Sequence, residues 1–163
     1  MALLFELVVE CGPQQADAGA VGRHFRGLAW TLTDATEVLI EGYGLHQDAE
    51  GNWWTWIGPS GVSRRGVGTP EDAQQLTEVG NYLYERLRSA PRFRFAIVSV
   101  EVSDSFTAED LSWLAQRTFM DGLVLSQTVW DQLGRPDHFV PFATGYVWRP
   151  YEGERYRDAS QFL

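Results

Sequence analysis

The sequence predicts a single α+β domain over residues 1–163, with a mainly antiparallel or mixed sheet, two well-defined helices at about 70–89 and 108–117, and short additional helical pieces. Three observations favour this class. The length of 163 residues suits one domain. Hydrophobic residues make up 44% of the chain, which is enough for a sizeable core. The predicted helices and strands do not alternate regularly, as they would in a fold built on a parallel sheet.

The N-terminal part of the chain predicts a strand followed by a helix. Residues 3–10 alternate as a strand does: positions 3, 5, 7 and 9 share one face, and Glu6 and Glu10 lie on the other. Residues 13–26 carry apolar side chains at helical spacing. Three glycines in and next to this segment each cost about 1 kcal/mol relative to Ala in a helix. A helix is still the favoured structure there.

The middle of the chain predicts a β-rich hairpin or meander. Residues 36–43 are predicted as one strand, and 53–57, Trp-Trp-Thr-Trp-Ile, as another. The turn-rich residues 46–52 between them predict that these two strands pair. A short strand is expected near 62–67, after a second turn at 58–61.

The segment 70–89 is the clearest helix in the sequence. Thr69 is predicted as the N-cap, Pro70 suits the first helical position, and Asp72 lies where a capping-box acid belongs. Apolar side chains then recur at helical spacing along one stripe. Pro91 ends the helix, because proline cannot continue it.

The C-terminal half predicts two further helices and three strands. Residues 93–102 are the most strand-like segment, and the lack of charge in their middle indicates a central strand. The helix at 108–117 follows. A short strand at 123–125 and a helix from Ser126 to Gly134 come next. One more strand, at 145–149, is expected among the prolines and glycines of the tail.

The net charge of −9 excludes several classes of partner. Nonspecific binding to nucleic acid or to an anionic membrane needs a positive surface, so neither is expected. No run approaches the ~18 apolar residues of a membrane span. Glu6 and Glu10 interrupt the segment that a signal peptide would need to be apolar. The single cysteine, Cys11, cannot form an internal disulfide, which fits a reducing compartment, and a cytoplasmic protein is expected.

No motif predicts a cofactor, a metal site or a catalytic residue. All 13 basic residues are arginine, so a phosphate-binding lysine and lysine Schiff-base chemistry are excluded. The three histidines lack metal-ligand spacing, and Cys11 is interpreted as a buried structural thiol. Whether the chain is an enzyme stays open, because catalytic groups commonly come together from distant positions.

Two tryptophans are the first candidates for binding. In an extended strand Trp54 and Trp56 share one face, opposite Trp53. An outward-facing pair would form a stacking or partner-anchoring surface, because tryptophan is enriched at interaction hot spots. The alternative is that helices or a second subunit cover both faces of this strand.

Arginines supply the remaining candidates. Arg64 and Arg65 lie in the loop before the long helix, where they would hold a carboxylate or phosphate; the alternative is an exposed loop that pairs with nearby acids. Trp148 and Arg149 join an aromatic ring to a cation, a composition typical of interfaces, although this tail would also pack on the core. The basic stretch 86–94 is explained by helix-dipole compensation and by solubility at a strand end.

Two functions agree with these features. The preferred hypothesis is a non-catalytic binding or protein-interaction domain with an acidic face for a basic protein, because residues 1–50 hold eight acids and only two arginines. The alternative is a small-molecule or anion-binding domain, with or without catalysis, whose site lies at the 58–70 loop and helix start. A homodimer that buries the aromatic residues is a third arrangement.

Overall fold

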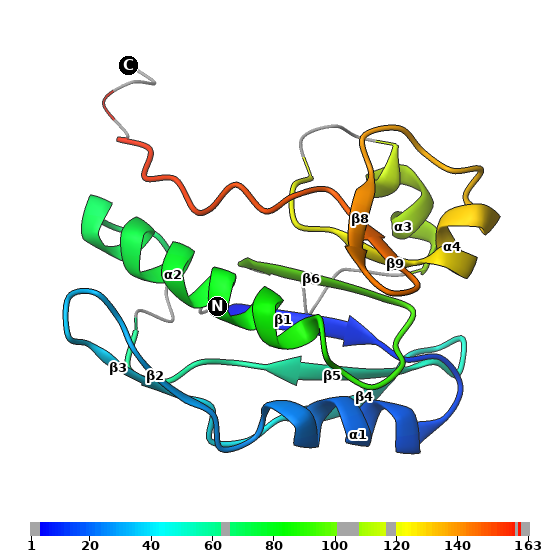
Figure 1. The fold of residues 1–163 in the computed structure, drawn as a ribbon, viewed down its shortest axis with the longest axis horizontal. Coiled ribbons are helices and arrows are strands. Elements are labelled where there is room, and N and C mark those ends of the chain that lie inside the picture. Colours follow the sequence, from blue (N-terminus) through cyan, green and yellow to red (C-terminus); the bar gives the residue numbers. More distant parts are fainter. Residues whose placement is uncertain (1–3, 63–65, 101–107, 117–119, 159, 161–163) are drawn as a thin grey trace.

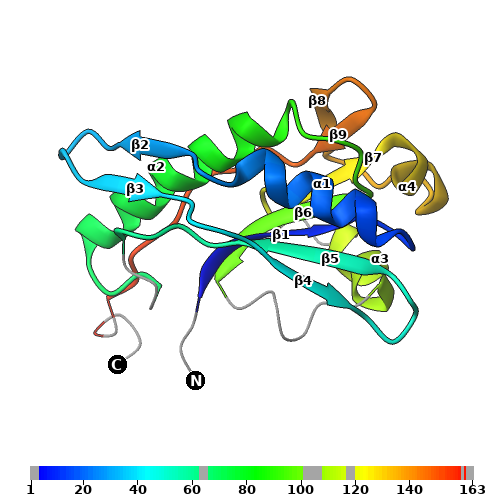
Figure 2. The same ribbon diagram turned by 90° about the horizontal axis from the view of Figure 1, so that it is seen from below.

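The computed structural model describes residues 4–62, 66–100, 108–116, 120–158 and 160. In this part of the chain a seven-stranded antiparallel sheet, a two-stranded hairpin and four helices form an α+β fold, which confirms the predicted class (Figures 1 and 2). The sheet has the order β4-β5-β1-β6-β7-β9-β8, and the hairpin joins β2 to β3. The strands are β1 (Phe5–Glu10), β2 (Ala29–Thr31), β3 (Glu37–Leu39), β4 (Gly44–Gln47), β5 (Trp53–Ile57), β6 (Phe95–Val100), β7 (Val124–Ser126), β8 (Val140–Ala143) and β9 (Tyr146–Trp148); the helices are α1 (Gln15–Phe25), α2 (Pro70–Leu87), α3 (Ala108–Ala115) and α4 (Gln127–Gln132).

Strand β1 lies inside the sheet, between β5 and β6. Leu7 pairs in register with Ile57 on one side and with Val98 on the other. Leu7 belongs to the core that α1 and α2 share with the sheet, whereas Val8 belongs to a second core under α3 and α4. Figure 1 shows these two helix pairs apart from each other around the central strands. All six residues of β1 are therefore buried.

Helix α2 forms where it is predicted, and it begins with the predicted capping box. Thr69 Oγ1 accepts a hydrogen bond from Asp72 N at 3.1 Å, and Asp72 Oδ2 accepts one from Thr69 N at the same distance. The apolar stripe of α2 is buried against the sheet. Tyr84 ties α2 to its neighbours, because its hydroxyl accepts from Val98 N at 2.9 Å and donates to Gly122 O at 2.7 Å.

The predicted hairpin between residues 36–43 and 53–57 is wrong. Strand β5 pairs with β4 instead, and the strand expected at 36–43 shortens to β3, which pairs with β2. The sequence does not predict β2 or β4 because both strands are short and mostly exposed, so their residues do not alternate between apolar and polar. Strand β4 contains a single apolar side chain, Leu45. The β2–β3 turn is closed locally, where Asp34 Oδ1 accepts a hydrogen bond from Thr36 N at 2.9 Å.

The other predicted elements are confirmed with shorter or slightly shifted bounds. These are α1, α3 and α4 among the helices and β1, β6, β7 and β9 among the strands. Strand β8 is not predicted, because Pro141 lies within it and its first two residues are exposed. Of the strand expected near 62–67, residues 62, 66 and 67 are not in a strand, and residues 63–65 lie outside the described residues, as do 101, 102 and 117. Across the described ranges no helix is long and apolar enough to cross a membrane.

Candidate functional site

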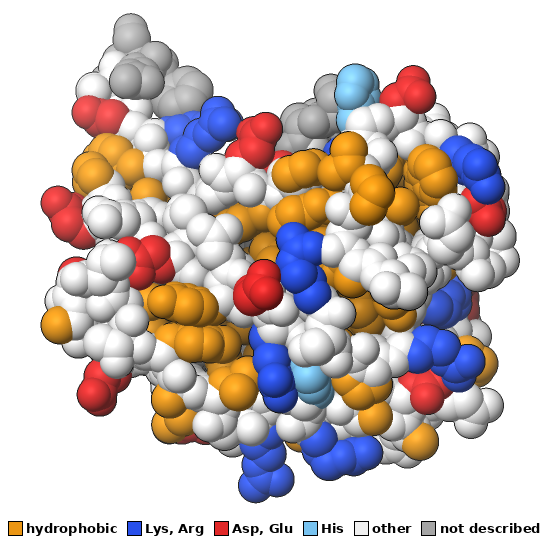
Figure 3. All heavy atoms as spheres, in the orientation of Figure 1, with side chains coloured by type: hydrophobic (Ala, Val, Ile, Leu, Met, Phe, Trp, Pro, Cys, Tyr) orange, Lys and Arg blue, Asp and Glu red, His pale blue; other side chains and the backbone are white. Residues whose placement is uncertain are grey.

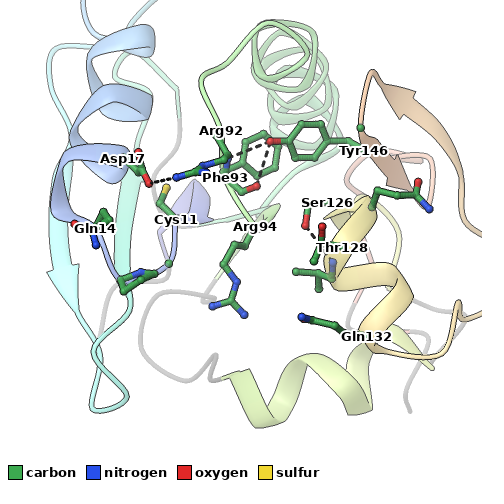
Figure 4. A pocket seen from close by; sticks show the side chains of 15 residues that line it. Cys11, Gln14, Asp17, Arg92, Phe93, Arg94, Ser126, Thr128, Gln132 and Tyr146 are labelled. Atoms are coloured by element: carbon green, nitrogen blue, oxygen red, sulfur yellow. Dashed lines mark hydrogen bonds and ion pairs between the residues drawn. The ribbon is translucent and has the colours of Figure 1, made fainter.

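The candidate site is a cleft of about 740 Å³ at the end of the central strands, where β1 and β7 end and β6 and β9 begin (Figure 4). The start of α1 forms one wall and α4 forms the other. The guanidinium of Arg94 extends into the opening between these walls, so we name the site the Arg94 cleft. Its lining consists of residues 11–14 and 17, 92–94, 126–129 and 132, and 145–146.

A tight turn leads from β1 into the first wall. Gly12 has a φ of +80°, a left-handed conformation that glycine adopts at little cost, and Pro13 follows it. Helix α1 then begins without a side-chain hydrogen bond from its N-cap residue, Gln14. The positive end of the helix dipole therefore lies beside the cleft without a side-chain acceptor from Gln14.

An aromatic pair gives the cleft an apolar inner side. The rings of Phe93 and Tyr146 stack with centroids 4.3 Å apart. The Tyr146 hydroxyl accepts a hydrogen bond from Phe93 N at 3.1 Å and donates one to Phe93 O at 3.2 Å, which fixes both rings. On the opposite wall Val129 is also buried. The cleft therefore offers a rigid apolar surface to a ligand with an apolar or aromatic body.

Polar side chains stand around this apolar surface. Gln14 lines the α1 wall, and Thr128 and Gln132 line the α4 wall. In the part of the chain that the structure describes, none of these three side chains has a hydrogen-bond partner, and all three residues are exposed. Ser126 differs, because its hydroxyl accepts from Val129 N at 3.2 Å and caps α4. The cleft thus offers several uncommitted donors and acceptors.

The backbone of Arg94 is hydrogen-bonded to both neighbouring strands, whereas part of its guanidinium has no hydrogen-bond partner among the described residues. Its N–H donates to Glu10 O and its carbonyl accepts from Ser126 N, both at 2.8 Å. Nη1 lies 3.3 Å from Glu10 Oε2 and 3.4 Å from Asn52 Oδ1. Among the described residues no acceptor bonds to Nε or Nη2, and the side chain is 38% exposed. These two N–H groups are available to an anion.

Glu10, the counter-ion of Arg94, is held in an unfavourable setting. Its side chain is only 1% exposed. Oε1 accepts a hydrogen bond from Gly12 N, whereas Oε2 has no hydrogen-bond partner among the described residues. Burial raises the pKa of Glu10 above its ordinary value, Arg94 and the Gly12 N–H oppose that rise, and Asp48 and Glu50 add to it. The ion pair with Arg94 therefore competes with a desolvation cost.

Arg92 at the rim of the cleft already has a partner. Its Nη2 lies 3.0 Å from Asp17 Oδ2, which joins the approach to β6 to α1. The Arg92 side chain is 80% exposed, so this pair contributes little to stability. Its charge is balanced within the rim, and Arg94 is the cation whose unengaged groups face the opening.

Cys11, the thiol in the lining of the cleft, is held in its neutral form. Burial raises the pKa of the Cys11 thiol to about 12, so it is not a nucleophile near neutral pH. No histidine lines the cleft beside it. Over the described ranges no three His, Cys, Asp or Glu side chains group together as metal ligands. What the geometry offers is a cation, polar walls and an apolar inner side.

The predicted tryptophan site divides between the core and the surface. Trp54 is buried, with its ring edge-on to Phe95 at 5.3 Å and its Nε1 donating to Asp48 at 2.8 Å. Trp56 is half-buried and stacks on the exposed His46 at 5.5 Å. Neither tryptophan lines the Arg94 cleft.

The predicted tail residues, Trp148 and Arg149, also lie away from the cleft. Trp148 is half-buried against the core, and Arg149 is buried and donates to the carbonyl of Ala115. Arg64 and Arg65 lie outside the described residues. None of the four predicted residues that the structure describes therefore lines the cleft.

Sequence reasoning misses the cleft because its parts come from four separate segments. Arg94 belongs to a basic stretch that the helix dipole and strand-end solubility explain equally well. The alternation from Arg92 to Phe95 places both arginines on one strand face, but it does not show that Gly12 and α4 lie opposite them. That juxtaposition requires the pairing of β6 with both β1 and β7.

The acidic residues of the N-terminal part are distributed over several places. Glu6 and Glu10 are buried in β1, and Asp17 pairs with Arg92. Asp34 and Asp48 lie in two different turns and accept hydrogen bonds there.

Comparison of the chain with protein-family models, curated proteins and solved structures finds no match. Function is therefore inferred from the geometry of the Arg94 cleft.

Proposed function

We propose that the protein is a non-catalytic domain that binds a small organic anion in the Arg94 cleft. The observation that supports this most strongly is the guanidinium of Arg94, which extends into the opening with Nε and Nη2 unengaged by the described residues. A guanidinium presents N–H donors in a planar fork that matches carboxylate, sulfonate and phosphate groups. The nearby N-terminal end of α1 favours the same sign of charge.

The size and lining of the cleft favour a small molecule. Its volume of about 740 Å³ falls in the range of ligand pockets, which run from about 300 to 1,000 Å³. The stacked Phe93 and Tyr146 favour a ligand with an apolar or aromatic body. Gln14, Thr128 and Gln132 would bind polar substituents. This proposal keeps the anion-binding hypothesis from the sequence but moves its site from the 58–70 loop to the cleft.

A titration with a model ligand tests this function. Benzenesulfonate carries one negative charge on an aromatic ring, and benzenesulfonamide is its neutral analogue. We expect calorimetry to detect binding of the anion and not of the neutral compound. Arg94→Ala should weaken binding about tenfold to a hundredfold, because a hydrogen-bonded charge contributes about 1.5–3 kcal/mol.

The matched control for this titration is Arg155→Ala. Arg155 is an exposed arginine, paired with Glu152, that does not line the cleft. This variant should bind benzenesulfonate as the unaltered protein does. Equal affinity of Arg94→Ala and Arg155→Ala would overturn the proposal, because the cleft cation would then have no role.

Protein binding is a second candidate function, favoured by one specific surface. Tyr82 is 38% exposed and stacks on Trp30 at 5.3 Å, so an aromatic pair bridges α2 and the β2–β3 hairpin. Figure 3 shows hydrophobic side chains gathered over this region. Glu78 and Asp34 lie near it, where Glu78 accepts from Thr33 and Asp34 from Gln75. Loss of a copurifying basic protein on Tyr82→Ala would support this second function, and unchanged copurification would count against it.

A further inference from the structure

We propose that the anionic group of the ligand, bound at Nε and Nη2 of Arg94, replaces Glu10 in neutralising the guanidinium, and that Glu10 binds a proton in the same step. The cleft would then take up a singly charged organic anion together with one proton. This inference rests on the proposed function and names the charge class of the ligand for that site. It adds a role for Glu10, which does not itself line the cleft.

The geometry of the Glu10–Arg94 pair is the first support. The Glu10 side chain is 1% exposed and that of Arg94 is 38% exposed, so the pair joins a buried carboxylate to a guanidinium that reaches the opening. Oε2 of Glu10 approaches Nη1 of Arg94 at 3.3 Å without forming a hydrogen bond. A ligand in the cleft can bind the guanidinium with good hydrogen-bond geometry, and it need not be buried as deeply as Glu10.

The charges around Glu10 are the second support. Arg94, from the approach to β6, is the cation that stabilises the carboxylate. Asp48 and Glu50, from the β4–β5 turn, repel it. From β5, the residue in register with Glu10 is Trp54, which carries no charge. From α1, Asp17 is itself negative and pairs with Arg92, so it does not stabilise the Glu10 carboxylate.

Binding of an anion therefore changes the protonation of Glu10. When the ligand neutralises Arg94, the buried Glu10 carboxylate loses the stabilisation by that positive charge. It still accepts the hydrogen bond from Gly12 N, and Asp48 and Glu50 still repel it. Burial already raises the pKa of Glu10 in the free protein, and the weakened pairing raises it further. Proton uptake then keeps the charge in balance: Arg94 is positive, the ligand is negative and Glu10 is neutral.

This exchange selects the charge class of the ligand. One negative charge on the ligand takes the place of the one negative charge that Glu10 loses. A dianion would bring a second negative charge, and among the described lining residues the other cation, Arg92, is already paired with Asp17 at the rim. We therefore expect benzenesulfonate to bind more tightly than phenylphosphate at a pH where phenylphosphate carries two charges.

The exchange also fixes the pH dependence of affinity. Benzenesulfonate stays ionised at every pH used, so its own titration does not contribute. Between the pKa of Glu10 in the free protein and its higher pKa in the complex, affinity should fall as the pH rises, by at most about tenfold per pH unit. Below and above this interval the affinity should be constant.

Calorimetry in two buffers with different enthalpies of ionisation measures the proton uptake directly. The full chain should take up protons as it binds benzenesulfonate, most strongly in the middle of the interval and at most one for each ligand bound. Glu10→Gln should take up none and should bind more tightly than the unaltered protein at a pH above the interval, because no carboxylate competes for Arg94. Binding without proton uptake, or equal uptake by Glu10→Gln, would overturn this inference and leave the proposed function standing. Absence of binding by the unaltered protein would overturn both.

A second measurement covers the case in which Glu10→Gln does not fold. The carboxyl carbon of Glu10 in ¹³C-labelled protein reports its protonation across a pH titration. Saturation with benzenesulfonate should move its midpoint to higher pH. A midpoint that stays unchanged while the probe is bound would overturn the inference without any variant.

Discussion

Glu10 Oε2 lies 3.3 Å from Arg94 Nη1, and this ion pair joins the buried interior of the sheet to the opening of the cleft. The Arg92–Asp17 pair nearby has a similar length, 3.0 Å, but the Arg92 side chain is 80% exposed. Water screens the outer pair, whereas the inner pair carries the electrostatic character of the site. Arg94 is therefore both part of the fold and the residue that presents a charge to a ligand.

The pH dependence of the free energy of unfolding should reveal the raised pKa of Glu10. Burial raises its pKa in the folded protein, so the folded state binds more protons than the unfolded state between the two pKa values. The stability that Glu10 contributes is fully present below the unfolded pKa and is lost as the pH rises through the folded pKa. In urea unfolding across this range, Glu10→Gln should lose less stability than the unaltered protein. Parallel pH profiles of the two proteins would contradict the raised pKa.

Tyr84→Phe should destabilise the fold by about 1–3 kcal/mol. The substitution removes the hydroxyl that accepts from Val98 N and donates to Gly122 O, and it leaves both buried backbone groups without that partner. Tyr82→Phe is the matched control, because Tyr82 is exposed on the same helix. It should change the free energy of unfolding by less than about 0.5 kcal/mol. Equal urea midpoints for the two variants would contradict the bridging role of Tyr84.

Gly22→Ala should lower stability although alanine favours helices. A Cβ at position 22 would overlap with Cδ2 of Tyr43, so the ring must move. Overpacking of this kind costs about 1–3 kcal/mol, which exceeds the gain of about 1 kcal/mol in helix propensity. The control is Gly42→Ala, because a Cβ there meets nothing within 4 Å. Thermal unfolding should show a lower midpoint for Gly22→Ala only, and a raised midpoint would show that α1 does not pack on Tyr43.

Cys11 should react slowly with thiol reagents in the folded protein. Its pKa of about 12 and its burial leave very little thiolate at about pH 8, so modification by Ellman's reagent should be on the order of a thousandfold slower than for an exposed cysteine. The same protein unfolded in urea is the control, and the rate should rise there to the ordinary value. Rapid modification of the folded protein would show that the thiol is open to the cleft.

The fold could be predicted in part because local signals define its main elements. The capping box at Thr69 and Asp72 and the apolar stripe after it fix α2 without any knowledge of its neighbours. Strand β6 is recognisable because it is buried on both faces. By contrast β4 and β2 depend on their pairing partners, and Leu45 alone does not produce an alternating pattern.

The site was harder to predict because exposure depends on contacts distant in sequence. Trp54 is covered by Phe95, and Arg149 is covered by α3 and by Phe139, so neither burial can be read from neighbouring residues. The position of Arg94 also depends on residues distant in sequence, because its backbone bonds to Glu10 and Ser126 on the two adjacent strands. The expectation that an arginine holds an anion survives as a proposal, with Arg94 in place of Arg64 and Arg65.

The most direct test of the Arg94 cleft is a ¹H–¹⁵N correlation spectrum of the full chain titrated with benzenesulfonate. We predict the largest shifts at the backbone amides of Gly12 and Gln15 and at the Nε–H of Arg94, and little change at Trp30 and Tyr82. In Arg94→Ala the backbone shifts should need about tenfold to a hundredfold more benzenesulfonate to reach half of their final size. Shifts that concentrate away from the cleft, or that reach half of their final size at the same concentration in Arg94→Ala, would contradict the assignment of this cleft as the anion-binding site.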